Sequence, residues 1–290
     1  MEWFLLSLFC AFSLATSDVF VKKALTGGSN EFTVSFIKFF FCLPPLYIML
    51  GLNGLPDVKT GFYIAALIST PLEITSMLLY NRAIKLSPLS LTLPFLAFTP
   101  IFLLLTAYLM IGEVPNSYGL IGILLISIGG YMLNIDMAKG IFYPFKAIMK
   151  ERGSVLMIIV ALIYSLTSVF GKIMIDNSNF IFAPAIYFTI VTLVMGVVTK
   201  VKGASLISSP PGNNKKLHFL LGLFFSLMVI SHFWAISMTK VEYMISVKRS
   251  SMLFTIIYGA IIFKEVDIKK RLFSVAVMLV GMVLIGVFGG

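Results

Sequence analysis

Lys248 and Arg249 are adjacent cations inside a stretch, residues 243–263, that contains no other charged residue. Charged side chains in such an apolar stretch usually face a cavity, a partner or the water boundary. Neighbours on a helix point about 100° apart, so the two cannot follow one face to that boundary. We expect one to reach the boundary and the other to point inward, where Lys248, Ser251 and Thr255 recur at helical spacing as a polar stripe. The alternative is that both extend outward from a helix start.

Further ionisable groups interrupt other apolar runs. Lys38, in "SFIKFFFCL", either lines a cavity or extends its stem to the membrane surface. Glu73, in "STPLEITSM", lies where no headgroup cation is within reach. We expect it to have a functional or ion-paired role, the alternative being a structural Glu that is protonated or bonded locally. His232 in "VISHFWAIS", with Trp234 nearby, can bind, carry a proton or pack, and residues 80–82 are interfacial anchors or ligands.

The candidate substrate-binding residues are therefore Lys38, Glu73, His232, Trp234, Lys248, Arg249 and Ser251. A cavity lined by three cations favours a carboxylate or phosphate over a quaternary cation, with Glu73 free to pair an amino group or to carry a proton. This set predicts transport of a small anionic or zwitterionic metabolite, with amino acids as the first candidates. Two alternatives stay open: proton-coupled export of hydrophobic cations through Glu73, and a membrane scaffold that moves no solute.

Composition indicates the kind of elements that must position these groups. Hydrophobic residues make up 59% of the 290 residues and charged residues 12%, with a mean hydropathy of +1.02. An average soluble domain is about one quarter charged. The chain is therefore expected to be an all-α integral membrane protein with little left for a soluble domain. At roughly 20 residues a span, its length permits about ten membrane-spanning helices.

Apolar runs broken by polar, Gly or Pro residues give ten predicted spans: 3–21, 33–51, 61–80, 90–111, 117–134, 154–175, 181–199, 217–238, 243–263 and 271–288. The basic and apolar segment 135–153 is expected to connect two halves and to suit the membrane surface, and 200–216 is expected to be a flexible loop. The first run is interpreted as a mature span because no Lys or Arg precedes it. Cys10 and Cys42 lie in apolar runs, where a thiol behaves as a small hydrophobe.

The two halves of the chain repeat one another. A shift of 152 residues places Glu113 on Glu265, and it places Gly122 and Gly129 on Ser274 and Gly281. The chain is thus predicted to hold two five-helix units, 1–134 and 154–290. Because five is odd, the second unit must enter the membrane in the opposite direction. Inverted repeats are typical of secondary transporters, with substrate bound near mid-membrane.

The sequence resembles the drug/metabolite transporter superfamily, specifically its ten-span branch with two EamA-type repeats. The resemblance is carried by "LMIGEV" (109–114) and "IIFKEV" (261–266), each followed by a turn and a Gly-containing span, "GLIGILLISIGGYML" and "LFSVAVMLVGMVLIG". "FTPIFLLLTAYLMIGE", with Pro100, is similar to the fourth span of that unit, although Met252 stands at the matching position of the second half. The resemblance implies a central cavity, alternating access and small polar metabolites as substrates, without specifying which.

Other functional classes are disfavoured by what the sequence lacks. It contains no G-x-x-x-x-G-K-[ST] phosphate loop, so ATP hydrolysis is not expected. Two His and two Cys residues offer no metal-ligand spacing, and we expect neither an enzyme nor a cofactor. The net charge of +10 comes from residues at span ends, not from a basic stripe interleaved with aromatic side chains, which argues against nucleic acid as a partner. The expected partners are the lipid bilayer, a small-molecule substrate and a coupling proton or ion.

The basic residues are unevenly distributed between the loops. Most of the 22 Lys and Arg residues flank or lie in loops that follow odd-numbered spans. The positive-inside rule then predicts that these loops are cytoplasmic and that both termini are outside. The family resemblance implies both termini in the cytoplasm, so the orientation stays open. Either way, the expected location is the cell membrane, as a multi-pass protein.

Overall fold

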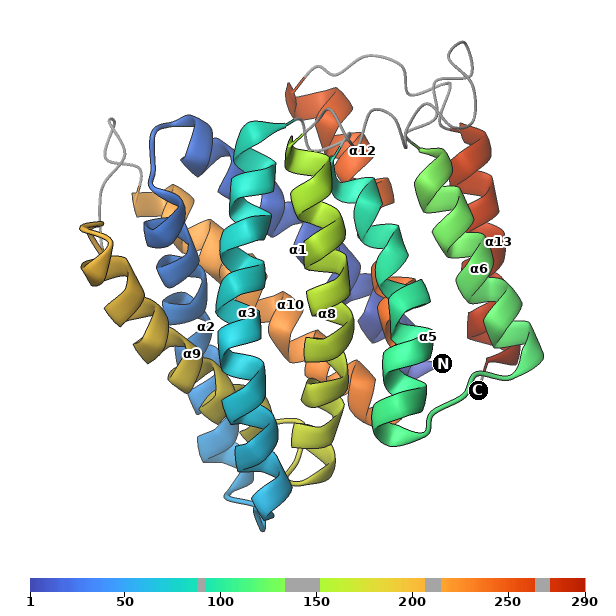
Figure 1. Ribbon diagram of the computed structural model, residues 1–290, viewed down its shortest axis with the longest axis horizontal. Helices are drawn as coiled ribbons and strands as arrows, with labels where there is room; N and C mark the ends of the chain where they lie inside the picture. Colours follow the sequence, from blue (N-terminus) through green and yellow to red (C-terminus); the bar gives the residue numbers. More distant parts are fainter. Residues whose placement is uncertain (88–91, 134–151, 207–214, 264–271, 290) are drawn as a thin grey trace.

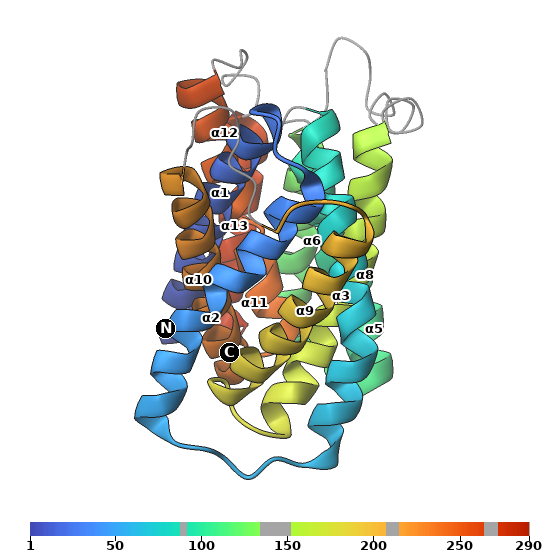
Figure 2. The ribbon, with the colours of Figure 1, turned by 90° about the vertical axis from the view of Figure 1, so that its left-hand side faces the viewer.

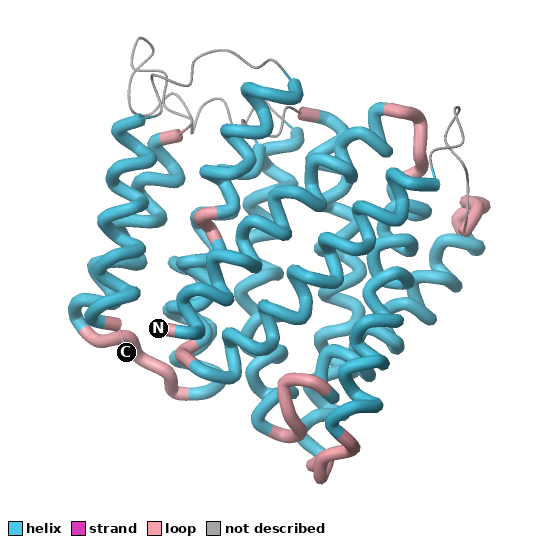
Figure 3. The backbone as a smooth tube through the Cα atoms, turned by 180° about the vertical axis from the view of Figure 1, so that it is seen from behind, coloured by secondary structure: helices cyan, strands magenta, loops and turns pink. Residues whose placement is uncertain are grey.

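The computed structural model describes residues 1–87, 92–133, 152–206, 215–263 and 272–289 (Figure 1). Helices account for nearly all of this backbone, and no strand occurs in it (Figure 3). The elements in chain order are α1 (Glu2–Thr26), α2 (Glu31–Asn53), α3 (Thr60–Leu86), the 3-10 helix η1 (Leu93–Phe98), α5 (Thr99–Ile111), α6 (Ser117–Met132), α8 (Arg152–Asp176), α9 (Phe182–Val201), α10 (Lys215–Met238), α11 (Val241–Lys248), α12 (Ser251–Phe263) and α13 (Leu272–Phe288).

Six of the described helices are long and apolar enough to cross a membrane, namely α1, α2, α3, α8, α9 and α10. Shorter apolar helices of 10–17 residues cover Phe95–Ile111, Ser117–Met132 and Phe273–Phe288. Each of the ten predicted runs contains helix, but only these six form a single helix of membrane-crossing length. The all-helical membrane architecture is thus confirmed, and the clear spans in the described residues number six.

The fourth predicted run, 90–111, is divided into η1 and α5. Pro94 lies in the first turn of η1 and Pro100 in the first turn of α5. Proline is tolerated there because the N–H that it lacks has no intrahelical partner in a first turn. The two prolines therefore set where each piece of this segment begins.

The ninth predicted run, 243–263, is divided as well, between α11 and α12. The N–H of Ser250 donates to the carbonyl of Val247 at 2.9 Å, and the N–H of Met252 donates to that of Arg249 at 3.1 Å. These bonds span three residues, so the backbone winds as a tight 3-10 turn that shifts the register between the two helices. Of the predicted polar stripe Lys248, Ser251 and Thr255, only Lys248 lines the central cavity described below.

The small residues of α6 and α13 bring these two helices into backbone contact. A Cβ added at Gly122 would lie 2.7 Å from the carbonyl oxygen of Gly281, and one at Gly129 would lie 2.9 Å from that of Ser274. Helices in a membrane approach this closely only where small residues face each other. The matching small residues of the two runs therefore contact each other within one chain.

Helices from the two ends of the chain alternate in the bundle. The long helix α1 packs along α10, α3 packs along α8, and α2 lies beside α9 (Figure 2). Each of these pairs joins a helix from the first half of the sequence to one from the second. The centre of the bundle is consequently lined by residues far apart in the sequence.

Some sequence expectations concern residues that the structure does not describe. Glu265, which the repeat pairs with Glu113, lies outside the described residues. The same holds for 135–151 of the expected connecting segment and for 207–214 of the expected loop. The N-terminus and the end of α13 near the C-terminus lie in the lower half of Figure 1.

Candidate functional site

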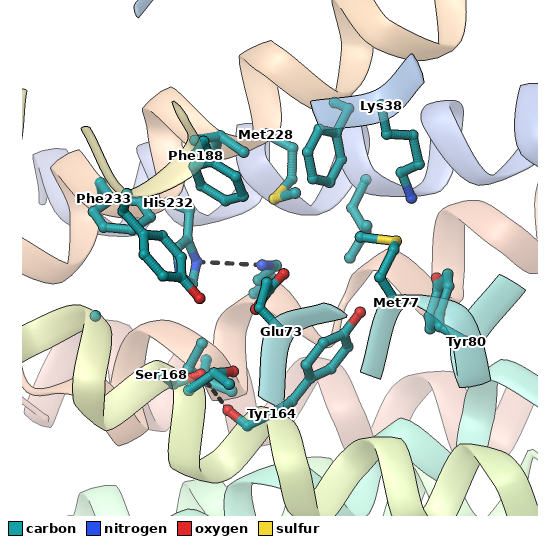
Figure 4. Close-up of a pocket in the computed structure, with 18 of the residues that line it drawn as sticks. Lys38, Glu73, Met77, Tyr80, Tyr164, Ser168, Phe188, Met228, His232 and Phe233 are labelled. Atoms are coloured by element: carbon teal, nitrogen blue, oxygen red, sulfur yellow. Dashed lines mark hydrogen bonds between the residues drawn. The ribbon is translucent and has the colours of Figure 1, made fainter. Parts of the chain in front are cut away.

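A cavity of about 80 Å³ lies near the middle of the bundle (Figure 4). Its lining comes from α1, α2, α3, η1, α8, α9, α10 and α11, together with Arg249 at the end of α11. A space of this size holds several water molecules but no bulky solute. Five of the seven predicted site residues line it, namely Lys38, Glu73, His232, Lys248 and Arg249.

Lys248 and His232 form a hydrogen-bonded pair in the cavity wall. The Nζ atom of Lys248 lies 3.2 Å from Nδ1 of His232 (Figure 4). An ammonium group can only donate, so Nδ1 accepts and the ring proton of a neutral His232 is on Nε2. The pair joins α10 to the last residue of α11, directly before the break between α11 and α12.

Arg249 also lines the cavity, with only 2% of its surface exposed. Its Nε atom has no hydrogen-bond partner. The expectation that one of the two adjacent cations reaches the membrane boundary is therefore wrong, and so is the alternative that both extend outward. The physical reason is the break between α11 and α12, because both cations lie at this mid-bundle junction and not at a helix start.

Lys38 is 1% exposed, so its stem does not extend to the membrane surface. Its Nζ atom lies 4.8 Å from the ring centroid of Phe225 and 5.5 Å from that of Tyr80. A cation over an aromatic face is attracted by the ring quadrupole, but such a contact does not neutralise its charge. Lys38 therefore contributes a positive charge to the cavity.

Glu73 lines the same cavity from α3 and interacts electrostatically with Lys248 and Lys38. Within the described part of the chain, the side chain forms no salt bridge. The carboxyl group thus lies among cations without being locked to one of them.

Trp234 and Ser251 are not brought to this cavity. Trp234 is 38% exposed and stacks on Phe180, with ring centroids 5.7 Å apart. Ser251 is buried at the start of α12 but is not part of the lining. The lining takes residues from α11 but none from α12, the helix that Ser251 begins.

Asp18 is a buried acidic residue that the sequence analysis did not identify as a site residue. Its Oδ2 atom accepts a hydrogen bond of 2.5 Å from the hydroxyl of Tyr80, which lines the cavity, and Oδ1 has no partner. Asp18 itself is 1% exposed and lies behind this lining. The predicted first run ends at residue 21 and places Asp18 near its end. Because α1 extends to Thr26, Asp18 lies farther inside the helix, where a buried acid would have been noticed.

Residues 80–82 divide between the two roles expected of them. Tyr80 and Asn81 are buried, and Asn81 donates a hydrogen bond of 2.7 Å to Ser35, so neither is an interfacial anchor. Arg82 is exposed. The helix α3 continues to Leu86, which places Tyr80 a full turn deeper than the predicted end of this run.

The rest of the wall is aromatic and sulfur-containing. Rings and thioethers surround the polar groups, with Tyr164, Tyr187, Phe188, Phe225, Phe233, Met77, Met174 and Met228 all in the lining. Tyr187 is fixed by a hydrogen bond of 2.9 Å to Ser69. A few polar groups in an apolar wall are typical of small-molecule sites. Among the described residues, no group of three His, Cys, Asp or Glu is close enough to hold a metal ion.

Comparison with known proteins links this arrangement to one family. The family model described as "EamA-like transporter family" matches residues 1–135 and again residues 151–287. A solved structure described only as "Crystal structure of protein" is similar with a TM-score of 0.72 and 13% identity, over 99% of this chain and 97% of that chain. At this identity the likeness concerns the fold alone. No curated protein sequence matches the chain at a significant level.

Proposed function

Because the chain belongs to the EamA-like transporter family, we propose that it is a secondary transporter of a small anionic or zwitterionic metabolite, with amino acids as the first candidates. It acts in the cell membrane by alternating access to the central cavity and has no enzymatic role. The observation that carries this proposal is the convergence of Lys38, Lys248 and Arg249 on one cavity that offers them no salt-bridge partner among the described contacts.

We further propose ten membrane spans arranged as two inverted five-helix repeats, 1–134 and 154–290. The two divided segments support this, because a shift of 152 residues places 93–111 on 245–263. The packing supports it as well, since the pair α1 and α10 corresponds to the pair α8 and α3 under exchange of the halves. In Figure 1, α1 rises from the N-terminus whereas α8 descends from the opposite end, as inversion requires.

The charges of the lining support an anionic group on the solute. Three cations face one carboxylate, Glu73, while His232 accepts from Lys248 and adds no charge. Among the described contacts, Nε of Arg249 has no hydrogen-bond partner, and Nζ of Lys38 lies over the rings of Phe225 and Tyr80. A carboxylate brought among these groups forms charge-assisted hydrogen bonds, which are roughly twice as strong as neutral ones.

The proposed zwitterion uses the opposite charge as well. Glu73 is the carboxylate of the lining, and the rings of Tyr164 and Tyr187 stand near it. An ammonium group is attracted both to a carboxylate and to aromatic faces. We therefore assign Glu73 to the amino group of the solute and the three cations to its carboxylate.

Glu73 and the aromatic wall also favour a second candidate, the proton-coupled export of hydrophobic cations. Its weakness is electrostatic, because a cation entering this cavity meets three positive side chains and one carboxylate. The two candidate functions predict that transport depends on different residues of the cavity. Cation export requires Glu73 and tolerates loss of Lys248, whereas transport of an anionic or zwitterionic solute requires the cations.

A thermal-shift screen of the purified protein in detergent tests the proposal. Amino acids, organic acids, sugar phosphates and hydrophobic cations are compared on the wild type, Lys248→Ala, Arg249→Ala and Glu73→Gln, with the exposed Arg82→Ala as the matched control. A ligand at a hundredfold excess over its Kd stabilises the folded state by about 2.7 kcal/mol. We expect an anionic or zwitterionic solute to shift the wild type and Arg82→Ala but not Lys248→Ala or Arg249→Ala.

Counterflow of the same solute into proteoliposomes then separates transport from binding. A shift by hydrophobic cations alone, lost only in Glu73→Gln, replaces the proposal with cation export. Absence of counterflow with every solute that binds favours the scaffold alternative.

A further inference from the structure

Glu242 is a fully buried carboxyl group outside the central cavity. It lies in the first turn of α11 and is 0% exposed, and neither of its carboxylate oxygens has a hydrogen-bond donor. An ionised carboxylate buried without a donor or a cation is strongly disfavoured. Something other than the described donors must therefore satisfy this group.

One polar neighbour of Glu242 is another carboxyl group, that of Glu113. Glu113 lies in the turn between α5 and α6, and its Oε2 atom accepts a hydrogen bond of 2.9 Å from the N–H of Val241. Its side chain is also within hydrogen-bonding reach of the side chain of Glu242. Two ionised carboxylates can only accept, so this contact is a hydrogen bond only when one of the two carries a proton.

The charged groups around the pair do not replace that proton. Lys240 acts on Glu242, but its ammonium group donates to the carbonyl of Val114 at 2.7 Å and forms no salt bridge in the described residues. Asp176, at the end of α8, repels Glu113, and Lys172 pairs with Asp176 at 3.8 Å.

On α11 itself, the hydroxyl of Tyr243 accepts a hydrogen bond of 2.9 Å from the N–H of Asn116. Tyr243 interacts with Glu242 electrostatically without a hydrogen bond between their side chains among the described contacts. Among the described contacts, Lys240 is the cation that acts on Glu242, Asp176 is a further acid near Glu113, and no side chain donates to Glu242. A single bound proton is the simplest way to balance the carboxyl pair.

We propose that Glu113 and Glu242 form a proton-binding site, separate from the substrate cavity, that couples proton movement to transport. The inference rests on the proposed function and names the coupling ion. The contact joins the α5–α6 turn of the first half to α11 of the second half, and neither residue lines the cavity. While the halves are in contact here, the pair holds one proton. When they separate, water reaches Glu242, and the proton leaves to bulk solvent.

Infrared spectroscopy of the purified protein tests the proton site itself. A protonated carboxyl group gives a C=O stretching band distinct from that of a carboxylate, and this band shifts when the exchangeable proton is replaced by deuterium. We expect such a band at neutral pH in the wild type and in Asp57→Asn, an exposed carboxylate changed as the control. Glu113→Gln and Glu242→Gln should each lose it, and a band that persists in both overturns the proposal.

Proteoliposomes test the coupling, with radiolabelled glutamate and alanine as the probes. The amide of Glu242→Gln donates to Glu113 as the protonated acid does, so the variant should fold and retain counterflow. We expect it to lose accumulation driven by a pH gradient, which for one proton per solute is about tenfold per pH unit. Gradient-driven accumulation equal to that of the wild type, in both Glu242→Gln and Glu113→Gln, overturns the proposal. Lack of counterflow in the wild type rejects the proposed function instead, while the infrared band still decides the proton site.

Discussion

Nζ of Lys248, on α11, lies 3.2 Å from Nδ1 of His232, on α10, inside the central cavity. The hydrogen bond orients the ammonium group of Lys248, the last residue of α11 before the break to α12. It also leaves the positive charge intact, because neutral His232 accepts without ionising. His232 therefore orients Lys248 in the cavity without neutralising its charge.

Replacing His232 with Ala should weaken solute binding even though His232 adds no charge. Lys248 loses the partner that orients it, and a hydrogen bond to a charged group contributes about 1.5–3 kcal/mol, which is roughly 10- to 100-fold in Kd. His232→Gln retains an acceptor and should recover part of the loss. Titration of the thermal shift with solute measures both variants. Equal binding by His232→Ala and the wild type contradicts a positioning role.

Lys38→Met should make the protein more stable and less active. Lys38 is buried over aromatic rings with no carboxylate bonded to it, so Met of similar length removes a desolvated charge and keeps the packing. Removing the desolvation cost of this buried charge is expected to outweigh its electrostatic interactions with Asp18 and Glu73. The melting temperature should rise while solute binding is lost. Lys23→Met, an exposed position on α1, is the control and should stay within about 0.5 kcal/mol of the wild type.

Tyr80→Phe should destabilise the protein through Asp18. The hydroxyl of Tyr80 is the hydrogen-bond donor to Asp18, and its removal leaves both oxygens of a buried carboxylate without a donor. The expected cost is about 1–3 kcal/mol. In the double variant Asp18→Asn with Tyr80→Phe, the cost of losing the hydroxyl should be smaller, because the neutral amide is less costly to bury. A double-mutant cycle in thermal unfolding measures the coupling, and strict additivity argues that the two groups act independently.

The helical bundle and most of its polar lining are predictable from the sequence, because apolar runs and isolated charges are local signals. Lys38, Glu73, His232, Lys248 and Arg249 were found in this way, since each is ionisable within an apolar run. Asp18 was missed because the predicted end of the first run placed it near a boundary, whereas α1 continues for five more residues, to Thr26.

The break between α11 and α12 was not predictable from local signals. Neither Gly nor Pro marks residues 249–250, and the 3-10 bonds there depend on how the segment packs between other helices. Ser251 lies beyond that break, on α12, which contributes no residue to the cavity lining. The interaction between Glu113 and Glu242 was not predictable either, because it joins the α5–α6 turn to helix α11, and only the tertiary fold brings these together.

Gly122→Ala should destabilise the packing of α6 on α13. The added Cβ would lie 2.6 Å from the Ile285 side chain and 2.7 Å from the carbonyl oxygen of Gly281, and backbone cannot yield as a flexible side chain does. Overpacking of this kind costs about 1–3 kcal/mol.

Gly51→Ala is the matched control for Gly122→Ala. Gly51 lies in α2, and its added Cβ would meet no atom within 4 Å. Alanine is the better helix former, so this variant should be neutral or gain about 0.4–1 kcal/mol. Thermal unfolding in the same detergent compares the two. If Gly122→Ala unfolds no earlier than Gly51→Ala, the contact between α6 and α13 is looser than these distances require. The two helices would then be able to slide during transport, whereas a clear loss of stability identifies them as a rigid seam about which the other helices move.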